Sequence, residues 1–242
     1  MSTLTKIMAS IILAILMISC NFDGNFGTGI NGNGQVVIKD RALNGSFSSI
    51  KVSRGIDLYL TQSDTESLSV EADENLQEII TTNIENDVLI ITASENIGRS
   101  TSKKVMLSFN HISAIKATSG SDVVSNNTIR VSDLELNSTS GSDIELTLDA
   151  ESVNCHSTSG SDIELKGKTN NFIAEATSGS SIKAEDLMTF NAQVKATSGA
   201  NIRVNTSKKL TAKASSGGDI RYSGNPEIIK TSDGVSGSIK GH

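Results

Sequence analysis

The sequence has very few of the residues that build disulfides, histidine-dependent sites and helix-rich cores. Among its 242 residues are two cysteines, three histidines, one proline and no tryptophan. If Cys20 is processed as described below, Cys155 has no partner in the mature chain, which excludes an intramolecular disulfide. A catalytic serine needs a nearby base, and only His111, His156 and His242 could supply an imidazole. The single proline beside 20 glycines indicates many strands and turns and few helices.

The chain also lacks the positive charge of a nucleic-acid-binding protein. Its 27 acidic residues outnumber its 21 basic residues, and its formal net charge is -6. Because Lys and Arg provide most contacts to a phosphate backbone, we do not expect a nucleic acid as a partner.

The N-terminus has the pattern of an export signal. Residues 7 to 18 form an apolar run after the single charge of Lys6, and Ser19 and Cys20 follow the run. The run is too short for a membrane span and is typical of a secretory signal. Bacterial lipoprotein processing requires a small residue before a cysteine at the cleavage point. We therefore predict a signal peptide over residues 1 to 19 and a lipidated Cys20; the alternative is an ordinary secreted protein.

Lipid on Cys20 would make the protein an outer-membrane lipoprotein whose first partner is the membrane itself. Either the periplasmic or the cell-surface face of the outer membrane is compatible with this signal. Residues 20 to 34 are rich in Gly and Asn and show no periodicity, so we expect them to form a tether.

From residue 117 the chain repeats one short motif. The copies read ATSGSDV, STSGSDI, STSGSDI, ATSGSSI, ATSGANI and ASSGGDI, and their glycines are Gly120, Gly141, Gly160, Gly179, Gly199 and Gly217. The intervals between these glycines are 21, 19, 19, 20 and 18 residues. Periods near 20 residues mark a solenoid, in which each coil buries its apolar face against the next coil.

Apolar and polar residues alternate on both sides of each glycine, which predicts two strands that meet at a corner. The third residue after each glycine is aliphatic and should point inward: Val123, Ile144, Ile163, Ile182, Ile202 and Ile220. The third residue before each glycine is small, as a crowded corner requires: Ala117, Ser138, Ser157, Ala176, Ala196 and Ala214. Cys155 shares the inward phase and is predicted to be buried, whereas His156 should lie on the surface.

A serine precedes the glycine in all six copies. Since no histidine base recurs with the repeat, these serines are not interpreted as nucleophiles. We expect their hydroxyl groups to bond the backbone at a tight turn.

Residues 35 to 116 are also predicted to form strands, less regularly. The segment VSRGIDLYL follows the repeat, because Gly55, Asp57 and Leu58 keep its spacing. Asp73 to Ile80 is the one predicted helical turn, with Asp73 as its N-cap. We expect this irregular β half to cover one end of a solenoid over residues 117 to 242, whose last stretch contains a degenerate copy, SGSIK, that would cap the other end.

The run GSFSSIKVSRGIDLYLTQSDTESLSVEADENLQEIITTNIENDVLIIT, followed by the TSGSD repeats and preceded by a lipoprotein signal, resembles the bacterial family called putative auto-transporter adhesin, head GIN domain. The likeness covers about residues 34 to 240. It implies an all-β fold, a right-handed parallel β-helix or solenoid with about 20 residues per coil, in a Bacteroidetes cell envelope. It implies no established biochemical activity. Only 25 residues follow Gly217, too few for a membrane barrel, so lipid on Cys20 would replace a barrel as the anchor.

The inward phase of the aliphatic residues directs a set of charges outward. If Ile144 points inward, five carboxylates share one outer patch: Asp122, Asp143, Glu145, Asp162 and Glu164. The column of Glu145 continues into a basic end of the stripe: Lys183, Arg203 and Arg221. Three interpretations are open for the acidic end: a solvated surface, a weak Ca²⁺ site or a catalytic carboxylate pair. No resident cofactor is predicted, and the calcium pattern GGxGxD is absent.

These observations favour a lipid-anchored envelope protein that binds glycans or envelope or host proteins through its solenoid surface, without catalysis. Two alternatives remain. One is a polysaccharide-active β-helix lyase or hydrolase, since β-helices host such enzymes. The other is a structural envelope protein that self-associates through its solenoid ends. The oligomeric state is open.

Overall fold

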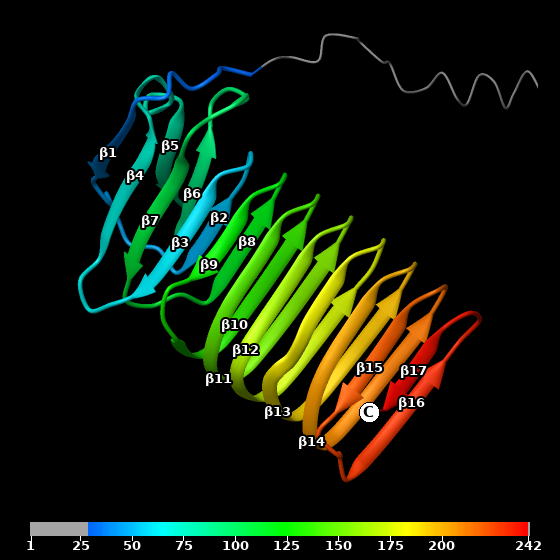
Figure 1. The fold of residues 1–242 in the computed structure, drawn as a ribbon. Coiled ribbons are helices and arrows are strands. Elements are labelled where there is room, and N and C mark those ends of the chain that lie inside the picture. Colours follow the sequence, from blue (N-terminus) through cyan, green and yellow to red (C-terminus); the bar gives the residue numbers. More distant parts are fainter. Residues whose placement is uncertain (1–28, 242) are drawn as a thin grey trace, which may run out of the picture.

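The computed structural model describes residues 29–241, which form strands and one 3-10 turn, η1 (Glu74–Leu76) (Figure 1). The signal segment and Cys20 lie outside the described residues. The strands are β1 (Val36–Arg41), β2 (Ser49–Val52), β3 (Asp57–Gln62), β4 (Ser67–Asp73), β5 (Ile80–Glu85), β6 (Val88–Ala93), β7 (Lys103–Phe109), β8 (Ala114–Thr118), β9 (Asp122–Ser125), β10 (Ile129–Thr139), β11 (Asp143–Thr158), β12 (Asp162–Ala176), β13 (Ser181–Thr197), β14 (Asn201–Ser215), β15 (Asp219–Ser223), β16 (Ile228–Asp233) and β17 (Ser238–Gly241).

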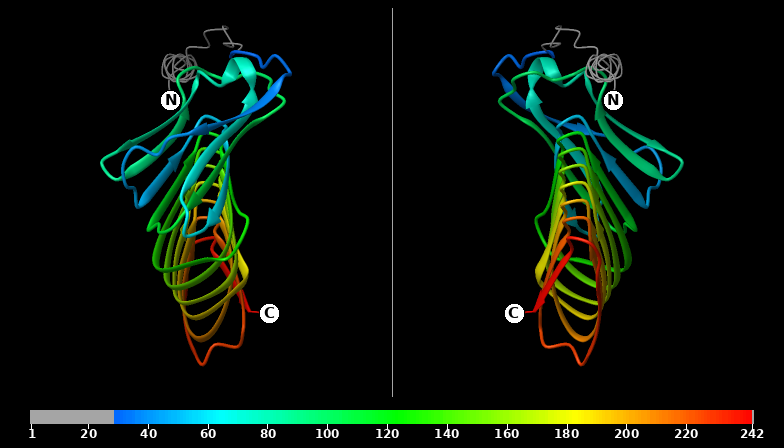
Figure 2. Two further views of the ribbon diagram at one scale, coloured as in Figure 1. Left: turned by 90° about the vertical axis from the view of Figure 1, so that its left-hand side faces the viewer. Right: turned by 90° about the vertical axis from the view of Figure 1, so that its right-hand side faces the viewer.

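The strands form a parallel β-solenoid of about seven turns with about 19 residues per turn, which confirms the predicted fold class. Seen from its end, the rod is a set of narrow nested loops (Figure 2). Each loop has two faces. The post-corner face holds the strand segments after each glycine corner, and the pre-corner face holds the segments before it. Because β11 to β14 run through the bend between the faces, all 17 strands belong to one sheet.

The two edges of the rod differ in their backbone conformation. At the corner edge, two consecutive residues adopt positive φ in all six copies of the repeat, as at Ser140 (58°) and Gly141 (68°). A left-handed residue costs about 1–2 kcal/mol unless it is glycine, which explains the glycine at the second position. At the bend edge, positive φ is confined to single coils, at Gly167 (108°) and at Gly224 and Asn225 (93° and 52°).

At three corners, those of Ser142, Ser161 and Ser180, the stabilising hydroxyl comes from the serine after the glycine and not from the serine we expected. Ser159, just before Gly160, has an exposed side chain whose hydroxyl lies 3.5 Å from Thr158 Oγ1. Ser161, just after Gly160, is buried. Its Oγ donates to the carbonyl oxygen of Ser138 in the preceding coil at 2.8 Å and accepts the N–H of Thr158 at 3.2 Å. The prediction for the serine before the glycine is therefore wrong, because the tight turn directs that side chain into solvent.

The inward residues of the repeat form the core that the sequence predicts. Ile144 and Ile163 are paired in register and are 1% and 0% exposed. The other members of the aliphatic column, and the small residues three positions before each glycine, are buried as well. Burial of each aliphatic side chain contributes about 1.5–3 kcal/mol. Cys155 is fully buried and His156 is exposed, as predicted.

The N-terminal strands do not follow their sequence order in space. Strands β2 and β3 stack in parallel between β6 and β7 on one side and β8 and β9 on the other. The predicted alignment of VSRGIDLYL on the repeat is confirmed, since Asp57 pairs with Asp122 and Leu58 with Val123. The predicted helix from Asp73 to Ile80 is confined to η1, because Ile80 already begins β5.

The two ends of the rod are covered differently. Antiparallel pairing of β1 with β4, β4 with β7 and β5 with β6 covers the N-terminal end. At the other end, β16 is exposed along its whole length and continues the stack on β14. Ile228 and Ile229 are 48% and 47% exposed there. The degenerate copy SGSIK thus adds a further half coil, β17, whose outer edge pairs with no other strand of residues 29–241, so the predicted cap at this end is not formed by these residues.

Candidate functional site

The predicted carboxylates lie on the post-corner face in the register that the repeat requires. Asp122, Asp143 and Asp162 are direct partners on successive strands, and Asp57 extends this column by one coil. We call these four residues the aspartate ladder. Neighbouring strands lie about 4.8 Å apart, so four like charges follow one another at that spacing. The sequence pattern aligns Asp57 with the repeat, but we did not expect it in the acidic patch.

The surroundings of the aspartate ladder disfavour its charged form. Burial raises the pKa of Asp143, and the charges of Asp122 and Asp162 raise it further. Burial likewise raises the pKa of Asp122, with the charge of Asp57 adding to it. Lys103 opposes both effects at Asp122 without cancelling them. These like charges are therefore held close together at a cost in free energy.

The two glutamates of the patch share one lysine that the repeat does not predict. Lys166 Nζ lies 2.9 Å from Glu145 Oε1 and 2.9 Å from Glu164 Oε1. Its hydrogen bonds to Glu164 and Glu145 raise the pKa of Lys166. Both glutamates thus serve as partners of one ammonium group.

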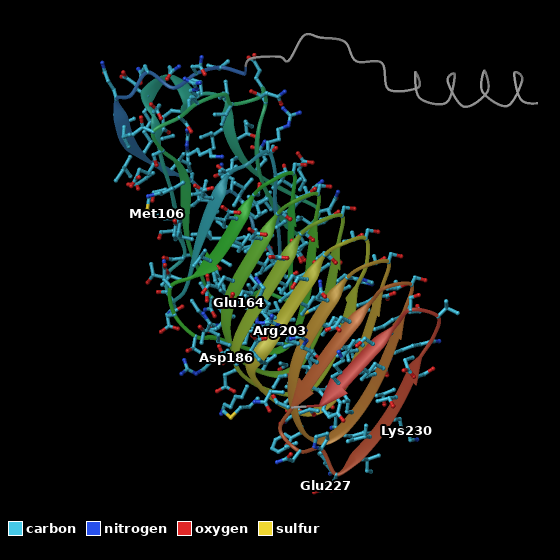
Figure 3. The ribbon with its side chains drawn as sticks, turned by 45° about the vertical axis from the view of Figure 1, so that its right-hand side comes forward. Met106, Glu164, Asp186, Arg203, Glu227 and Lys230 are labelled. Carbon is cyan, nitrogen blue, oxygen red and sulfur yellow. The ribbon has the colours of Figure 1, made fainter. Side chains whose placement is uncertain are left out.

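The basic end of the stripe continues the glutamate column, as predicted. Lys183, Arg203 and Arg221 are register partners, and Lys240 follows them on β17. Glu164 and Arg203 lie along the same outer face of the rod in Figure 3. The cations are paired locally: Lys183 with Asp162 at 3.4 Å, Arg203 with Glu185 at 3.1 Å and Arg221 with Asp219 at 3.2 Å.

These pairings bear on the predicted cation site. Among residues 29–241, no three Asp, Glu, His or Cys side chains are grouped as ligands for one metal ion. Glu145, Glu164 and Asp162 each have a cationic partner. The structure lends no support to Ca²⁺ binding, which stays a prediction. The glutamates and the basic end of the stripe form a solvated, internally paired surface, whereas Asp122 and Asp143 make no ion pair within the described residues.

A groove lies at the bend edge, away from the stripe. It has a volume of about 1020 Å³ and crosses β10, β11, β12, β13 and β14. Each coil contributes side chains at the point where it turns from the post-corner to the pre-corner face. The lining residues are His111, Arg130, Val131, Ser132, Asp149, Ala150, Glu151, Lys168, Thr169, Asn170, Met188, Thr189, Phe190, Asn205 and Ser207.

Hydrogen bonds fix the N-terminal end of the groove. The side chain of Gln62 donates to the carbonyl oxygens of Asn110 at 3.1 Å and Arg130 at 3.0 Å, and it accepts the N–H of Arg130 at 2.8 Å. Gln62 thereby ties the loop that carries His111 to the start of β10. His111 and Arg130 are presented on backbone that is already ordered.

An irregular strand forms the other end of the groove. The pairing of β13 with β14 passes from Ala184–Val204 directly to Met188–Asn205, so β13 carries three extra residues at the bend. Beyond this bulge, Met188 and Phe190 flank the buried Thr189, so both take outward positions and are 63% and 55% exposed. Thr206 Oγ1 donates to the carbonyl oxygen of Phe190 at 3.0 Å, which holds the exposed ring on a bonded backbone.

The polar groups between these ends are paired across coils. Lys168 Nζ lies 3.3 Å from Asp149 Oδ2, and Asn170 donates to Glu151. Lys168 follows Gly167 at the rim of the groove. The φ of Gly167 is +108°, and a Cβ on Gly167 would collide with the carbonyl oxygen of Leu148, so this position requires glycine. The paired groups keep unsatisfied donors and acceptors on their outer sides, where a polar ligand could bond.

The groove was not predicted from the sequence, although one signal for it was present. Arg130, Asp149 and Lys168 are register partners at the bend, and in the next coil Met188 takes their place. An apolar residue at an outward position that is charged in three preceding coils departs from the repeat. Such a departure indicates a surface with another purpose than solvation.

Similarity to solved structures extends over the whole described rod. A putative adhesin from Bacteroides fragilis is 20% identical, with a TM-score of 0.82 over 88% of this chain and 100% of that chain. A putative lipid binding protein from Parabacteroides distasonis is 22% identical, with a TM-score of 0.72 over 88% of this chain and 99% of the other. At these identities the likeness shows a shared fold.

A putative adhesin from Parabacteroides distasonis, 17% identical, has a TM-score of 0.74 over 88% of this chain and 99% of that chain. A comparison with curated proteins finds no match. Within the described residues, no helix has the length and apolar composition needed to cross a membrane. The family profile described as "Putative auto-transporter adhesin, head GIN domain" matches residues 46–226, and the chain belongs to this family.

Proposed function

We propose that this protein is an adhesin-type binding module of the cell envelope, held at the outer membrane by lipid on Cys20 and free of catalytic activity. Its ligands are glycans, or proteins of the envelope or of a host. The observation that carries the proposal is the groove at the bend edge. It is a preformed concave surface on a rigid rod, with paired polar groups and two exposed apolar side chains.

Support for a role without catalysis comes from the positions of the carboxylates. Glycoside hydrolysis uses two carboxyl groups that face each other across the scissile bond. In the groove, Asp149 is held by Lys168 and Glu151 by Asn170. The aspartate ladder has carboxyl groups with raised pKa, but it lies on the post-corner face and does not line the groove.

The binding proposal is tested with the full chain, purified in detergent, on arrays of glycans and of envelope proteins. We expect saturable binding to at least one class, and no release of reducing ends from soluble polysaccharides with or without Ca²⁺. Turnover of a polysaccharide would replace the proposal with the lyase or hydrolase alternative. Absence of binding to every glycan, envelope protein and host-cell surface tested would overturn it.

The anchor is tested separately. Cys20→Ala should move the protein from the membrane fraction to the soluble fraction, whereas Cys155→Ala should leave it in the membrane fraction. Protease shaving of intact cells then distinguishes the faces of the outer membrane. Complete protection from protease would contradict a role in adhesion at the cell surface and leave binding within the periplasm.

A further inference from the structure

The most informative residue of the groove is Phe190. Phe190 is 55% exposed and so lacks most of the stabilisation that a buried phenylalanine contributes. Other phenylalanines of the chain are buried, since Phe172 is 1% exposed and Phe109 is 0% exposed. Phe190 nevertheless stands outward, and its carbonyl oxygen accepts the hydroxyl of Thr206 on β14. Its ring faces the same groove as the paired polar groups of β11 and β12.

The charge of the lining argues against a polyanionic ligand. Arg130 and Lys168 are balanced by Asp149 and Glu151. Lys168 and Asp149 already form an ion pair across neighbouring coils. A surface without net charge gives no electrostatic preference for phosphate or uronate groups.

The backbone and the floor of the groove exclude two other occupants. A peptide that adds to a sheet needs a free strand edge, but β11 to β13 are each paired on both sides, so no edge is open there. An acyl chain needs a continuous apolar floor. Here the buried floor passes from Ala150 to the hydroxyl-bearing Thr169 and Thr189 on the next two coils.

A neutral carbohydrate satisfies each of these conditions. Its hydroxyl groups can donate to carboxylates and accept from ammonium and amide groups, all of which line the groove. The C–H face of a pyranose ring can lie on an exposed aromatic ring. The groove crosses five coils, and four coil spacings of about 4.8 Å give it a length of about 19 Å, which suits a chain of several sugar units rather than a single one.

We infer that the groove binds a neutral oligosaccharide laid along the rod axis, with Phe190 as the stacking platform and the Lys168–Asp149 and Asn170–Glu151 pairs as hydrogen-bonding groups. This inference rests on the proposed binding function and specifies its ligand class. Met188 borders the same ring and extends the apolar contact. His111 and Arg130, tied in place by Gln62, mark the other end of the bound chain.

The experiment uses the full chain in detergent on an array of neutral oligosaccharides of two to six units, with uronate-containing and sulfated glycans alongside. The best neutral ligand is then titrated calorimetrically against variants. Phe190→Ala should weaken binding at least tenfold, and Phe190→Trp should bind within about threefold of the unaltered chain. Affinity should increase with chain length until the groove is filled, and it should change little between low and moderate salt, because a neutral ligand is not screened.

Two control variants alter apolar or aromatic side chains that lie outside the groove. Tyr59→Ala removes an aromatic ring from β3 on the post-corner face, and Ile173→Ala removes a half-exposed apolar side chain from the pre-corner face of β12. Both should bind as the unaltered chain does. Circular dichroism and melting temperature establish that Phe190→Ala is folded, as expected for an exposed side chain.

The outcomes separate the ligand inference from the proposed function. If a neutral glycan binds but Phe190→Ala binds equally well, the groove inference is wrong and the binding function stands. The groove inference is equally wrong if only charged glycans or proteins bind. If the unaltered chain binds no glycan, no envelope protein and no host cell, both proposals fail together.

Discussion

The carboxylate of Asp73 accepts the backbone N–H of Ser102 at 3.1 Å and so joins the end of β4 to the start of β7. The other carboxylate oxygen accepts the N–H of Gly34 at 2.6 Å. Burial by itself would raise the pKa of Asp73, but the backbone N–H groups of Ser102, Gly34 and Thr101 outweigh it and hold this pKa below its ordinary value of 3.8. Asp73 therefore stabilises the antiparallel strands that cover the N-terminal end of the rod.

We expect Asp73→Asn to lower the melting temperature by several degrees at pH 7, because an amide nitrogen would then face backbone donors. The carboxylate has a lower pKa in the folded state than in the unfolded state. Its contribution is thus fully present above the unfolded value near 3.8 and is lost as the pH falls through the folded value. Thermal unfolding from pH 2 to 7 measures this dependence. Asp64→Asn, at an exposed position, is the control, and equal melting temperatures for the two variants would contradict the assignment.

The aspartate ladder should behave in the opposite way. Since the pKa of Asp143 is raised in the folded state, its protonated form is favoured by folding, and this contribution disappears as the pH rises through the folded pKa. We expect Asp143→Asn to stabilise the protein at pH 7 by about 0.2–1 kcal/mol, the range for relief of opposed like charges. The gain should shrink toward pH 4 in denaturant melts.

Asp133→Asn on β10 is the control for Asp143, because Asp133 is exposed and lies outside the ladder; its effect should stay within about 0.5 kcal/mol. A loss of stability in Asp143→Asn at pH 7 would show that favourable interactions of the Asp143 carboxylate outweigh its repulsion by the other aspartates of the ladder.

The same pair of variants tests the predicted Ca²⁺ site. If Ca²⁺ raises the melting temperature of the unaltered chain but not that of Asp143→Asn, the cation prediction is supported.

The serine after each corner glycine should matter more than the serine before it. Ser161→Ala leaves the carbonyl oxygen of Ser138 and the N–H of Thr158 without the hydroxyl that they bond, at a cost of about 1–3 kcal/mol. Ser159→Ala should cost less than about 0.5 kcal/mol, since its hydroxyl is exposed. Urea denaturation measures both. Equal costs for the two variants would contradict the assignment of the corner-stabilising hydroxyl to Ser161. The alanine itself should fit, because Ala200 occupies the same position in a later coil and is buried.

Charges on the last strand should keep the rods apart. In β16, Lys230 is the register partner of Thr211, and Asp233 continues the inward position of Ala214. Charged side chains on an open edge, above all at inward positions, disfavour pairing with another strand. We expect the double variant Lys230→Val, Asp233→Val to form concentration-dependent oligomers by light scattering, because it joins the exposed Ile228 and Ile229 into an apolar edge.

The control for that edge is Lys116→Val, Asp133→Val, which removes the same charges from exposed positions on β8 and β10, where both strands are already paired. It should stay monomeric. Oligomers of the unaltered chain that dissociate when Ile229 is replaced by lysine would instead favour the structural, self-associating alternative.

A large part of the fold follows from the sequence alone. Glycines at intervals of 18 to 21 residues fix where the backbone can turn with positive φ, and alternation of apolar and polar residues fixes which side chains face inward. Those two constraints placed Ile144 in the core, Asp143 and Glu145 outside it, and Lys183 in the column of Glu164. A period of two leaves no other register for a strand that must bury one face.

Only the tertiary structure decided the contacts that the spacing of the repeats does not specify. Lys166 forms ion pairs with both Glu145 and Glu164 from two residues beyond Glu164, because side-chain reach rather than column position selects the partner. Strands β2 and β3 lie between strands that come later in the chain, an order that no local pattern records. The groove is lined by residues of five stacked strands, β10 to β14, and its depth exists only once these coils lie side by side.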